Sequence, residues 1–419
     1  MKLVLSHPTG NQNVRAALKG LLNEKLLSQF YTSIASFPGT FLDTIGSIKE
    51  LSEIRRRRFY PGLRSITHTS PWLEVGRIIA SKAGLTKLIK NETGIVSIDA
   101  IYRNLDKLVS SRLKNLAKKG INGIYCYEDG AMKSFYEAKK YGIECFYDLP
   151  IGYWKTSREL LEFERERWPE WASTLTGFID SDFKLARKDE ELRRADAIFV
   201  ASNFTANTLK KFPGNLAPVS IIPYGFPPVN SERFYEQINK RPLKLLFVGG
   251  LSQRKGIADL FSVADKLGRH IELTVVGRKA TDNCKPLNEA LKKHQWIPSL
   301  PHNKILQLMQ RNDVLVFPSL FEGFGLVITE AMSQGTPVIT TGRTAGPDLI
   351  EHGRNGWLID AGSTDALHGA IENLLHNPGL IPKAGCAAMD TANKRPWEVY
   401  GKELAAAIMK SSSCSGINS

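Results

Sequence analysis

Glu322 and Glu330, which are separated by seven residues, flank a glycine-containing turn that could bind a phosphate group. An apolar strand is predicted over 313–317 just before them, and Gly323 and Gly325 allow the backbone to approach a ligand closely. A helix is predicted to begin near Gly325, so its first N–H groups would point into the turn and favour an anion such as a diphosphate. Carboxylates beside such a site are suited to accept hydrogen bonds from the hydroxyl groups of a ribose and of a second sugar.

A second loop, which is glycine-rich and basic, follows the strand predicted over 243–248. It contains Gly249 and Gly250, which leave room for a ligand against the backbone, and then Arg254 and Lys255. The two cations could neutralise negative charge that develops on a departing diphosphate. The loop matches neither a Walker sequence nor a dinucleotide fingerprint.

Polar side chains in the first half of the chain also stand at predicted strand ends. His7 and Asn11 lie in the loop after the first strand, and Asp148 lies at a later strand exit. These three could line the side of the site that receives an acceptor. Glu128 could hold or deprotonate an acceptor hydroxyl. The alternatives are that Asp129, next to it, only caps a helix and that Asp148 only forms a turn.

Two further charged segments have weaker claims to a site. Arg278 ends a predicted strand at the same sheet edge as Lys255 and could reach a nucleotide, although a solvated role is equally open. The triplet Asp180-Ser181-Asp182 has the D-x-D form of a metal site, but it lies in a polar, helix-rich stretch and not after an apolar strand. We interpret this triplet as incidental.

Alternating strands and helices must position these residues. Such alternation predicts two tandem α/β domains, each a Rossmann-like parallel sheet covered by helices, with the strand ends facing a cleft between the domains. The segment 40–95 is harder to interpret and is expected to contain inserted helices. The predicted strands are 3–5, 121–127, 143–148, 197–201, 243–248, 271–276, 313–317 and 336–340; the predicted helices are 14–27, 98–118, 130–141, 302–311, 326–334 and 364–375.

The spacing of Glu322 and Glu330, about 70 residues beyond the basic loop, resembles the family 4 glycosyltransferases of the GT-B fold. The resemblance is specific over about 195–410 and only architectural over 1–194. Further segments that carry it are Ala201-Ser202-Asn203-Phe204-Thr205, Ile222-Pro223-Tyr224-Gly225, Val276-Gly277-Arg278, Phe317-Pro318-Ser319, Gly335-Thr336-Pro337-Val338-Ile339 and Arg395-Pro396-Trp397.

The resemblance implies a retaining transfer from a nucleotide sugar, without a bound metal or other cofactor. Lys255 would then hold the diphosphate, Glu322 would contact donor-sugar hydroxyls and Glu330 would bind the ribose. Gly10 would lie opposite, near the diphosphate and the acceptor. The donor-binding set that follows is Gly10, Gly249, Gly250, Arg278, Phe324, Gly325, Leu326 and Glu330.

This chain departs from the family at Gly250, where the family usually has an arginine. Arg254 could supply the missing charge. The resemblance also implies the domain boundaries. Residues 1–235 would form an N-terminal acceptor-side domain and residues 236–395 a C-terminal donor-binding domain. Residues 396–410 would form a helix that in this family crosses back to the first domain, and residues 411–419 a flexible tail.

Composition narrows the class of protein. The net charge of +14 attracts anions, while the five scattered cysteines indicate neither a disulfide framework nor a zinc site. No signal peptide or membrane-spanning run is apparent, so we expect a cytoplasmic protein. The cluster Arg55-Arg56-Arg57-Arg58 could touch anionic lipid at the inner face of a membrane, or could simply be a solvated surface. No nucleic-acid-binding signature is present.

The sequence therefore predicts a retaining glycosyltransferase. It would move a sugar from a UDP- or GDP-type donor to a glycan or lipid-linked acceptor, in surface polysaccharide or glycoconjugate biosynthesis. A sugar-nucleotide epimerase of the same fold and a non-catalytic, transferase-like binding subunit are the alternatives. The base, the sugar and the acceptor depend on pocket shape, which the fold does not give.

Overall fold

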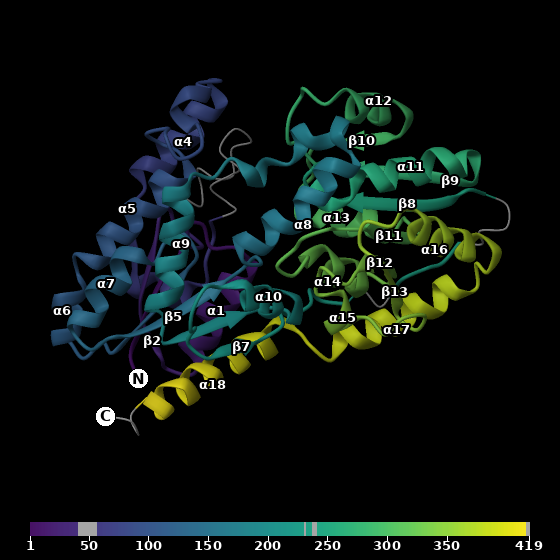
Figure 1. Cartoon of the computed structure of the whole chain (residues 1–419). Coiled ribbons are helices and arrows are strands. Elements are labelled where there is room, and N and C mark those ends of the chain that lie inside the picture. Colours follow the sequence, from purple (N-terminus) through teal and green to yellow (C-terminus); the bar gives the residue numbers. More distant parts are fainter. Residues whose placement is uncertain (41–56, 230–231, 237–240, 416–419) are drawn as a thin grey trace.

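The computed structural model describes residues 1–40, 57–229, 232–236 and 241–415, with side chains as far as residue 412. Two parallel sheets stand beside each other, one in the purple-to-teal half of the chain and one in the green half (Figure 1). The predicted α/β class with two Rossmann-like domains is confirmed.

The first sheet has seven strands within the described residues, and neighbouring strands are paired in parallel. Their order is β3-β2-β1-β4-β5-β6-β7. Its central strands are buried, as expected for a sheet with helices on its faces. The strands are β1 (Leu3–Ser6), β2 (Leu27–Thr32), β3 (Thr67–Thr69), β4 (Gly123–Tyr127), β5 (Glu144–Leu149), β6 (Ala197–Val200) and β7 (Val219–Ile221).

The second sheet has six strands within the described residues, in the order β10-β9-β8-β11-β12-β13, again with parallel pairings. The strands are β8 (Leu243–Val248), β9 (Ile271–Val276), β10 (Gln295–Ile297), β11 (Val314–Phe317), β12 (Val338–Thr341) and β13 (Gly356–Ile359).

Each sheet reverses its winding direction once, and these points locate the site. In the first sheet the chain moves outward from β1 to β3 and then returns to place β4 on the other side of β1. In the second sheet β8 and β11 are the equivalent neighbours. Ligands of open parallel sheets bind at such switch points, outside the carboxyl ends of the strands. The candidate loops after β1, β4, β8 and β11 are therefore the loops that the topology favours.

The helices of the first domain follow the apolar spacing of the sequence. In α1 the buried side chains include Val14, Ala17, Leu18 and Leu21, which form one face of a helix. The helices are α1 (Gln12–Asn23), α4 (Trp72–Lys82), α5 (Ile98–Ser110), α6 (Leu113–Lys118), α7 (Met132–Lys140), α8 (Trp154–Arg167), α9 (Asp182–Arg194) and α10 (Asn203–Thr208).

The helices of the second domain, and the helix that follows it, agree with the prediction for 302–311, 326–334 and 364–375. They are α11 (Ile257–Leu267), α12 (Lys285–Lys293), α13 (His302–Met309), α14 (Leu326–Ser333), α15 (Gly346–Leu349), α16 (Thr364–His376), α17 (Leu380–Asn393) and α18 (Trp397–Ser415).

Two predicted helices of the first domain were wrong in extent. The helix expected over 14–27 ends at Asn23, and Leu27 begins the buried strand β2. The helix expected over 98–118 is two helices, because the chain turns at 111–112 between α5 and α6. In both cases an apolar run continued past a turn, and periodicity alone could not find the break.

The difficult segment 40–95 contains more than inserted helices. Residues 41–56 lie outside the described residues, and so do Arg55 and Arg56 of the basic cluster. The rest holds the edge strand β3, helix α4 and short 3₁₀ turns. Arg57 does not face solvent as the cluster suggested, since it hydrogen-bonds the Thr9 carbonyl and pairs with Glu74. No helix of the described residues is long and apolar enough to cross a membrane.

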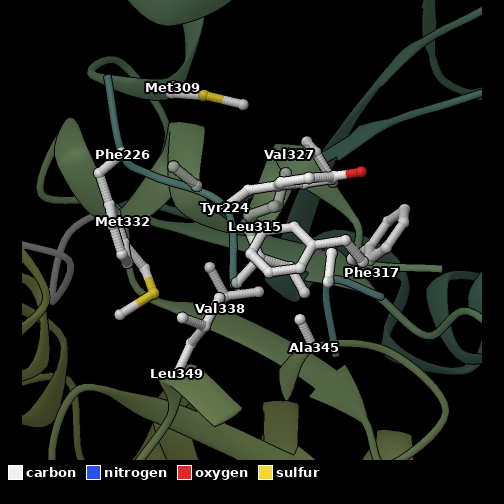
Figure 2. Close-up of a cluster of buried hydrophobic side chains, with 14 of the residues drawn as sticks. Tyr224, Phe226, Met309, Leu315, Phe317, Val327, Met332, Val338, Ala345 and Leu349 are labelled. Carbon is white, nitrogen blue, oxygen red and sulfur yellow. The ribbon is translucent and has the colours of Figure 1, made fainter. Parts of the chain in front are cut away.

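The linker between the domains is packed against the second domain's core. Tyr224 and Phe226 belong to the same buried cluster as Leu315 and Val338 of the second sheet (Figure 2). The Phe226 backbone also bridges to Pro396, just before α18. The outgoing and the returning connections between the domains therefore cross at one place.

Helix α18 crosses from the second domain back to the first and packs along α1 (Figure 1). Gly20 and Gly401 meet at this crossing, where a Cβ on Gly20 would lie 2.3 Å from the Gly401 carbonyl oxygen. Such close approach requires glycine. The helix continues to Ser415, so residues 411–415 are helical and not part of a flexible tail as predicted; residues 416–419 lie outside the described residues.

A segment of the first domain, α8 with the 3₁₀ helix Pro169–Thr174, lies against the second domain. Trp171 stacks on Phe261 with ring centroids 6.0 Å apart, and Arg167 pairs with Asp259. The Thr174 hydroxyl accepts a hydrogen bond from the backbone of Gln253, at 2.8 Å, in the basic loop. We call residues 154–174 the α8 segment.

Candidate functional site

A cavity of about 370 Å³ opens where the switch-point loops of the two sheets meet. We call it the Lys255 cavity. The loops after β1, β8 and β11 all contribute to its wall, so the topology assembles it from segments that are far apart in the sequence. Its lining residues are Asn11, Asn13, Pro150, Tyr224, Val248, Gly249, Lys255, Phe317, Glu322, Phe324, Gly325, Leu326 and Val327.

Lys255 and Glu322 form an ion pair inside this cavity, with Lys255 Nζ against Glu322 Oε2. The ammonium also lies 4.8 Å from the centre of the Phe317 ring. Burial and the neighbouring Arg254 cation lower the pKa of Lys255. An anion entering the cavity would compete with Glu322 for the ammonium.

Gly256 brings the basic loop and the Glu322 loop together. It adopts a left-handed φ of +69°, and a Cβ there would lie 2.2 Å from the Pro318 carbonyl oxygen. A side chain would therefore push apart the loops that carry Lys255 and Glu322. The sequence placed both loops at one sheet edge but did not show that Gly256 closes the gap between them.

The first turn of α14 lines the Lys255 cavity. Gly325 is its N-cap, with φ +88°, and no side chain caps the turn. The first N–H groups of a helix have no intrahelical partner and carry partial positive charge, so they favour an anion. Gly325, Leu326 and Val327 all belong to the cavity wall, which is where a diphosphate was predicted. Phe324 is also there, with its ring 4.9 Å from that of Tyr224.

The glycine before Phe324 fixes this turn against the first domain. The Gly323 carbonyl accepts hydrogen bonds from the hydroxyls of Ser202, at 2.6 Å, and Thr205, at 2.8 Å. A Cβ at Gly323 would lie 1.9 Å from the Pro150 carbonyl oxygen. The segment Ala201 to Thr205, singled out in the sequence, therefore joins the domains at the site.

Glu330 stands one turn further along α14, and its carboxylate lies 3.0 Å from His302 Nε2. This hydrogen bond raises the pKa of His302. Glu330 is not among the residues that line the Lys255 cavity. Glu322 and Glu330 thus have different surroundings, one inside the cavity and one bonded to a half-exposed histidine.

Of the remaining predicted donor residues, Gly249 lines the cavity, while Gly250 and Arg278 do not. Gly250 is exposed and has open space where a Cβ would lie. The Arg278 side chain is exposed as well, and its backbone carbonyl accepts a hydrogen bond from the Leu251 N–H. The structure does not bring these two residues to Lys255.

In the loop after β1, Asn11 lines the Lys255 cavity, whereas His7 forms hydrogen bonds within the loop. His7 Nδ1 accepts hydrogen bonds from the N–H groups of Thr9, at 3.1 Å, and Gly10, at 3.0 Å. Burial lowers the pKa of His7 to about 3, so its ring is neutral. The acceptor-side role considered for His7 is therefore not supported by its position. The Gly10 N–H is directed at His7 and not at the cavity.

A second cavity, of about 190 Å³, lies between α8, α9 and the second domain. We call it the Glu128 cavity. It combines aromatic and apolar side chains with charged ones from both domains. Its lining residues are Glu128, Ile151, Gly152, Trp154, Ser157, Arg158, Leu161, Leu175, Thr176, Gly177, Asp180, Leu185, Lys188, Ser252, Arg254 and Phe321.

Glu128 is held in this cavity by Lys188 of α9, with Nζ 3.3 Å from Glu128 Oε1. Burial raises the pKa of Glu128, and the Lys188 ammonium opposes that shift. A carboxylate in this position can accept a hydrogen bond from a hydroxyl group, or take its proton. Lys188 had no sequence signal, because it lies within an ordinary charged helix.

Arg254 belongs to the Glu128 cavity and not to the Lys255 cavity. Its Nη1 donates to the Phe321 carbonyl at 2.8 Å and lies 3.5 Å from Glu322 Oε2. The guanidinium thus stands at the boundary between the cavities. Its main hydrogen bond holds the turn that carries Glu322, which differs from the predicted role of contacting the diphosphate.

Asp148 is buried behind the cleft and lines neither cavity. Its Oδ2 accepts a 2.6 Å hydrogen bond from the Tyr125 hydroxyl. Burial raises the pKa of Asp148 to about 7. The predicted contact of Asp148 with an acceptor was wrong, because the side chain points into the domain at this strand end.

Asp129 does not cap a helix, as its alternative reading suggested. It has a left-handed φ of +70°, which is uncommon for a residue with a side chain, and its carboxylate binds Arg187 at 2.7 Å. Glu191 instead accepts hydrogen bonds from the N–H groups of Asp129, Ala131 and Met132 at the start of α7. Burial raises the pKa of Glu191 to about 8.

The D-x-D triplet is split between two tasks. Asp180 lines the Glu128 cavity and bonds Lys184 at 3.0 Å, while Ser181 caps α9. Among the residues that the structure describes, no group of three or more His, Cys, Asp or Glu side chains could hold a metal ion. Trp154 and Arg158 also line the cavity, and they were missed because no motif marks the sequence of α8.

Comparison with known proteins finds a family that the second domain resembles. Residues 229–391 match the family described as glycosyl transferases group 1. Curated relatives include a glycogen synthase of Mycobacterium tuberculosis, with 26% identity over 47% of this chain and 50% of that protein. Another is the capsular polysaccharide biosynthesis glycosyltransferase CapM of Staphylococcus aureus, with 29% identity over 37% of this chain and 42% of that protein. The chain spans about half the length of these relatives.

Solved structures match over nearly the whole chain and show the fold. A sucrose-phosphate synthase of Thermosynechococcus elongatus superposes with a TM-score of 0.67 at 16% identity, covering 99% of this chain and all of that one. HepE of Anabaena, solved with UDP, gives a TM-score of 0.63 at 16% identity over 98% of this chain and all of that one. Both match across the two sheets, which establishes the two-domain arrangement. At this level of identity they show the fold alone, so the chemistry must be argued from the residues of the site.

Proposed function

We propose that this chain, whose residues 229–391 form a group 1 glycosyl transferase domain, moves a sugar from a nucleoside-diphosphate sugar to a hydroxyl group of an acceptor. The observation that carries this proposal is the Lys255–Glu322 pair beside the open first turn of α14. A cation and a helix N-terminus can hold a diphosphate, and a carboxylate can bind sugar hydroxyls.

The donor would occupy the Lys255 cavity. Lys255 would release Glu322 and bind the diphosphate, and Glu322 would then accept hydrogen bonds from the transferred sugar. Glu330, further along α14, would bind the ribose hydroxyls after exchanging its bond to His302. A UDP-type donor is the first choice, because HepE of the same fold was solved with UDP and with UDP-glucose.

The acceptor would approach from the Glu128 cavity. Trp154 and Phe321 offer flat apolar surfaces to a sugar ring, while Glu128 and Asp180 offer hydrogen-bond acceptors to its hydroxyl groups. A glycan, free or carried by a lipid, has this chemistry. We assign the enzyme a role in surface polysaccharide or glycoconjugate synthesis, as the name of its relative CapM, a capsular polysaccharide biosynthesis glycosyltransferase, suggests.

We further propose that the transfer retains the anomeric configuration and needs no metal. Among the residues that line the Lys255 cavity, Glu322 is the one carboxylate, and it is paired with Lys255. A route through a covalent intermediate would need a free carboxylate at the reacting carbon. Attack on the same face, with the leaving phosphate taking the acceptor's proton, needs only positioning and charge stabilisation.

The test is donor turnover by the purified chain. UDP-, GDP-, ADP- and TDP-sugars are incubated with it and nucleotide release is followed, with Glu322→Ala beside the parent protein. Release from one donor that is absent in the variant supports the proposal and identifies the donor. If a nucleotide sugar is instead converted to its epimer with no acceptor present, the chain is an epimerase. If no nucleoside diphosphate raises its melting temperature and no donor is consumed, the chain is a non-catalytic subunit.

A further inference from the structure

Helix α4 exposes three of its apolar side chains and buries its acidic one. Trp72 and Ile79 are 82% and 60% exposed, and Val75 between them is exposed as well. Glu74 is 1% exposed and Ala80 2%. A surface helix of a globular protein normally buries its apolar stripe and exposes its charges, so α4 has the reverse arrangement.

Ion pairs fix the helix in this orientation. Glu74 binds Arg77 through both of its oxygens, at 2.8 and 2.9 Å, and also pairs with Arg57 at 2.5 Å. Rotating α4 to bury Trp72 would break these contacts, including the pair that ties the helix to Arg57 of the preceding segment. The outward apolar face is therefore held in place by the packing of the helix.

The apolar surface continues beyond the helix. Val96 packs against Gly76, so the segment after α4 lies beside it, and this segment exposes Leu85, Ile95 and Ile98. Single exposed apolar residues need no explanation, but a group at one corner of a domain does. We call these residues the α4 face: Trp72, Val75, Ile79, Leu85, Ile95 and Ile98.

Charges within the segment that carries the α4 face are mostly positive. Residues 57–98 contain seven Lys and Arg but only two acidic residues, Glu74 and Glu92. Glu74 is buried, and Glu92 accepts hydrogen bonds from Ser181. Exposed cations stand at Arg64, Lys82, Lys87 and Lys90. An exposed tryptophan with isoleucines, surrounded by Lys and Arg, is the composition of a helix that lies in the headgroup region of an anionic bilayer.

We propose that the α4 face docks on the surface of an anionic lipid bilayer. Since β3 is parallel to its neighbours, its carboxyl end at Thr69 lies on the cleft edge of the first sheet, and Trp72 starts α4 three residues later. In Figure 1, α4 stands at the top of the first domain, beside the gap between the domains. If the proposed transferase function holds, docking there presents the cleft to an acceptor carried by lipid.

The experiment is flotation of the full chain with vesicles. We expect the chain to float with vesicles of phosphatidylglycerol and phosphatidylcholine, and to stay in solution with phosphatidylcholine alone. Raised salt should weaken the binding, because the Lys and Arg contribution is screened. The variant Trp72→Ser with Ile79→Ser should bind at least about tenfold more weakly, since each substitution removes apolar area that the headgroup region would bury.

Two further variants keep the test decisive. Phe234→Ser removes a side chain of the second domain that is 79% exposed, and it should leave flotation unchanged. Lys82→Glu with Lys87→Glu should weaken binding to the anionic vesicles while keeping the apolar side chains. All of these positions are exposed, so melting temperatures close to that of the parent chain are expected.

Three results would overturn the proposal. The parent chain could stay in solution with both kinds of vesicle. Both double variants could float as well as the parent chain. Sedimentation could instead show self-association that Trp72→Ser with Ile79→Ser abolishes, which would make the α4 face a protein interface. Nucleotide release from a donor without vesicles tests the transferase function separately, so either proposal can fail alone.

Discussion

The Lys255 cavity and the Glu128 cavity hold their charged groups in different ways. Lys255 and Glu322 project from short loops of one sheet, and the glycines at 256 and 325 allow those loops to meet. Glu128 sits in a network that depends on Lys188, 60 positions later in the chain. Both pairs join residues far apart in the sequence, but the first connects two strand-end loops, whereas the second connects a strand end with the helix α9.

Arg254 and Lys255 show how closely the two cavities adjoin. They are neighbours in the chain, yet Lys255 lines one cavity and Arg254 the other. Both side chains still reach Glu322 Oε2, since Arg254 Nη1 lies 3.5 Å from it and Lys255 Nζ pairs with it. The two residues thus share one carboxylate but line different cavities, and we expect their loss to appear in different assays.

The largest effect is expected from Lys255→Ala. Removing the ammonium leaves the departing diphosphate with less compensating charge, and donor turnover should fall by about a thousandfold, or about 4 kcal/mol. Donor turnover and affinity for the nucleoside diphosphate are measured together. Arg278→Ala is the matched control, because it removes an exposed cation at the same sheet edge and should change neither. A variant Lys255→Ala that retained a tenth of the parent rate would show that the cavity does not hold the diphosphate.

Glu128→Gln comes next, and it should separate the cavities. Transfer to the acceptor should fall by about a hundredfold if Glu128 acts on the acceptor hydroxyl, while donor hydrolysis and nucleotide affinity stay unchanged. Glu190→Gln, which removes a carboxylate of α9 that pairs with Arg193 and Arg194 at the surface, is the control. Equal loss of donor binding and transfer would mean that Glu128 supports the whole domain and not the acceptor.

The buried acids of the first domain should appear in the pH dependence of stability. The pKa of Asp148 is about 7 in the folded chain and about 4 when unfolded, so between these values the folded state holds a proton that the unfolded state lacks. The free energy of unfolding should then fall as pH rises from about 4 to about 7, by at most about 1.4 kcal/mol per pH unit. Above pH 7 this contribution is lost.

Asp148→Asn removes that titration while keeping an oxygen for the Tyr125 hydroxyl. Urea unfolding between pH 5 and pH 8 should show a shallower slope in the variant than in the parent chain. Glu191, whose pKa is also raised, keeps part of the slope in both proteins. Identical slopes would show that Asp148 is ionised in the folded chain throughout this range.

Arg254→Ala should have the smallest effect. The guanidinium supports the Phe321 carbonyl at the boundary of the cavities, so we expect a loss of about 1 kcal/mol, seen as a roughly fivefold rise in the KM for the acceptor. The KM for the donor should stay within twofold, a change too small to count as a lost hydrogen bond. A large rise in the KM for the donor would instead indicate that Arg254 contacts the diphosphate. That is the role predicted from the sequence, in which Arg254 replaces the arginine that the family usually has at the position of Gly250.

The sequence predicted the second domain better than the first for a physical reason. Strand, glycine turn and helix follow one another there within a few residues, so β11, Gly325 and α14 could be placed from local pattern alone. Lys255 and Glu322 were predicted in the same way and lie together. The contact of Gly256 with Pro318 joins distant loops and had no local sign.

In the first domain the same reasoning found strand ends but not side-chain directions. Glu128 lines a cavity, while Asp148, at a neighbouring strand end, is turned into the core. Alternation along a strand decides which side chain faces the cleft, and a shift of one residue reverses it. Asp129 was found as a helix-start residue, and its contact with Arg187, 58 positions later in the chain, decides what it does. His7, found in a strand-end loop, bonds within that loop.

The crossing of the two interdomain connections limits how the halves of the molecule can move. Phe226 and Pro396 are bridged side by side, and α18 is anchored to α1 by the meeting of Gly20 and Gly401. The helix must therefore travel with the first domain, which leaves one pivot for the second. Rotation about that pivot would pull Asp259 away from Arg167 on the α8 segment. Any rotation of the second domain about this pivot must therefore break interdomain contacts, of which Arg167–Asp259 and the bonds of Ser202 and Thr205 to Gly323 are examples.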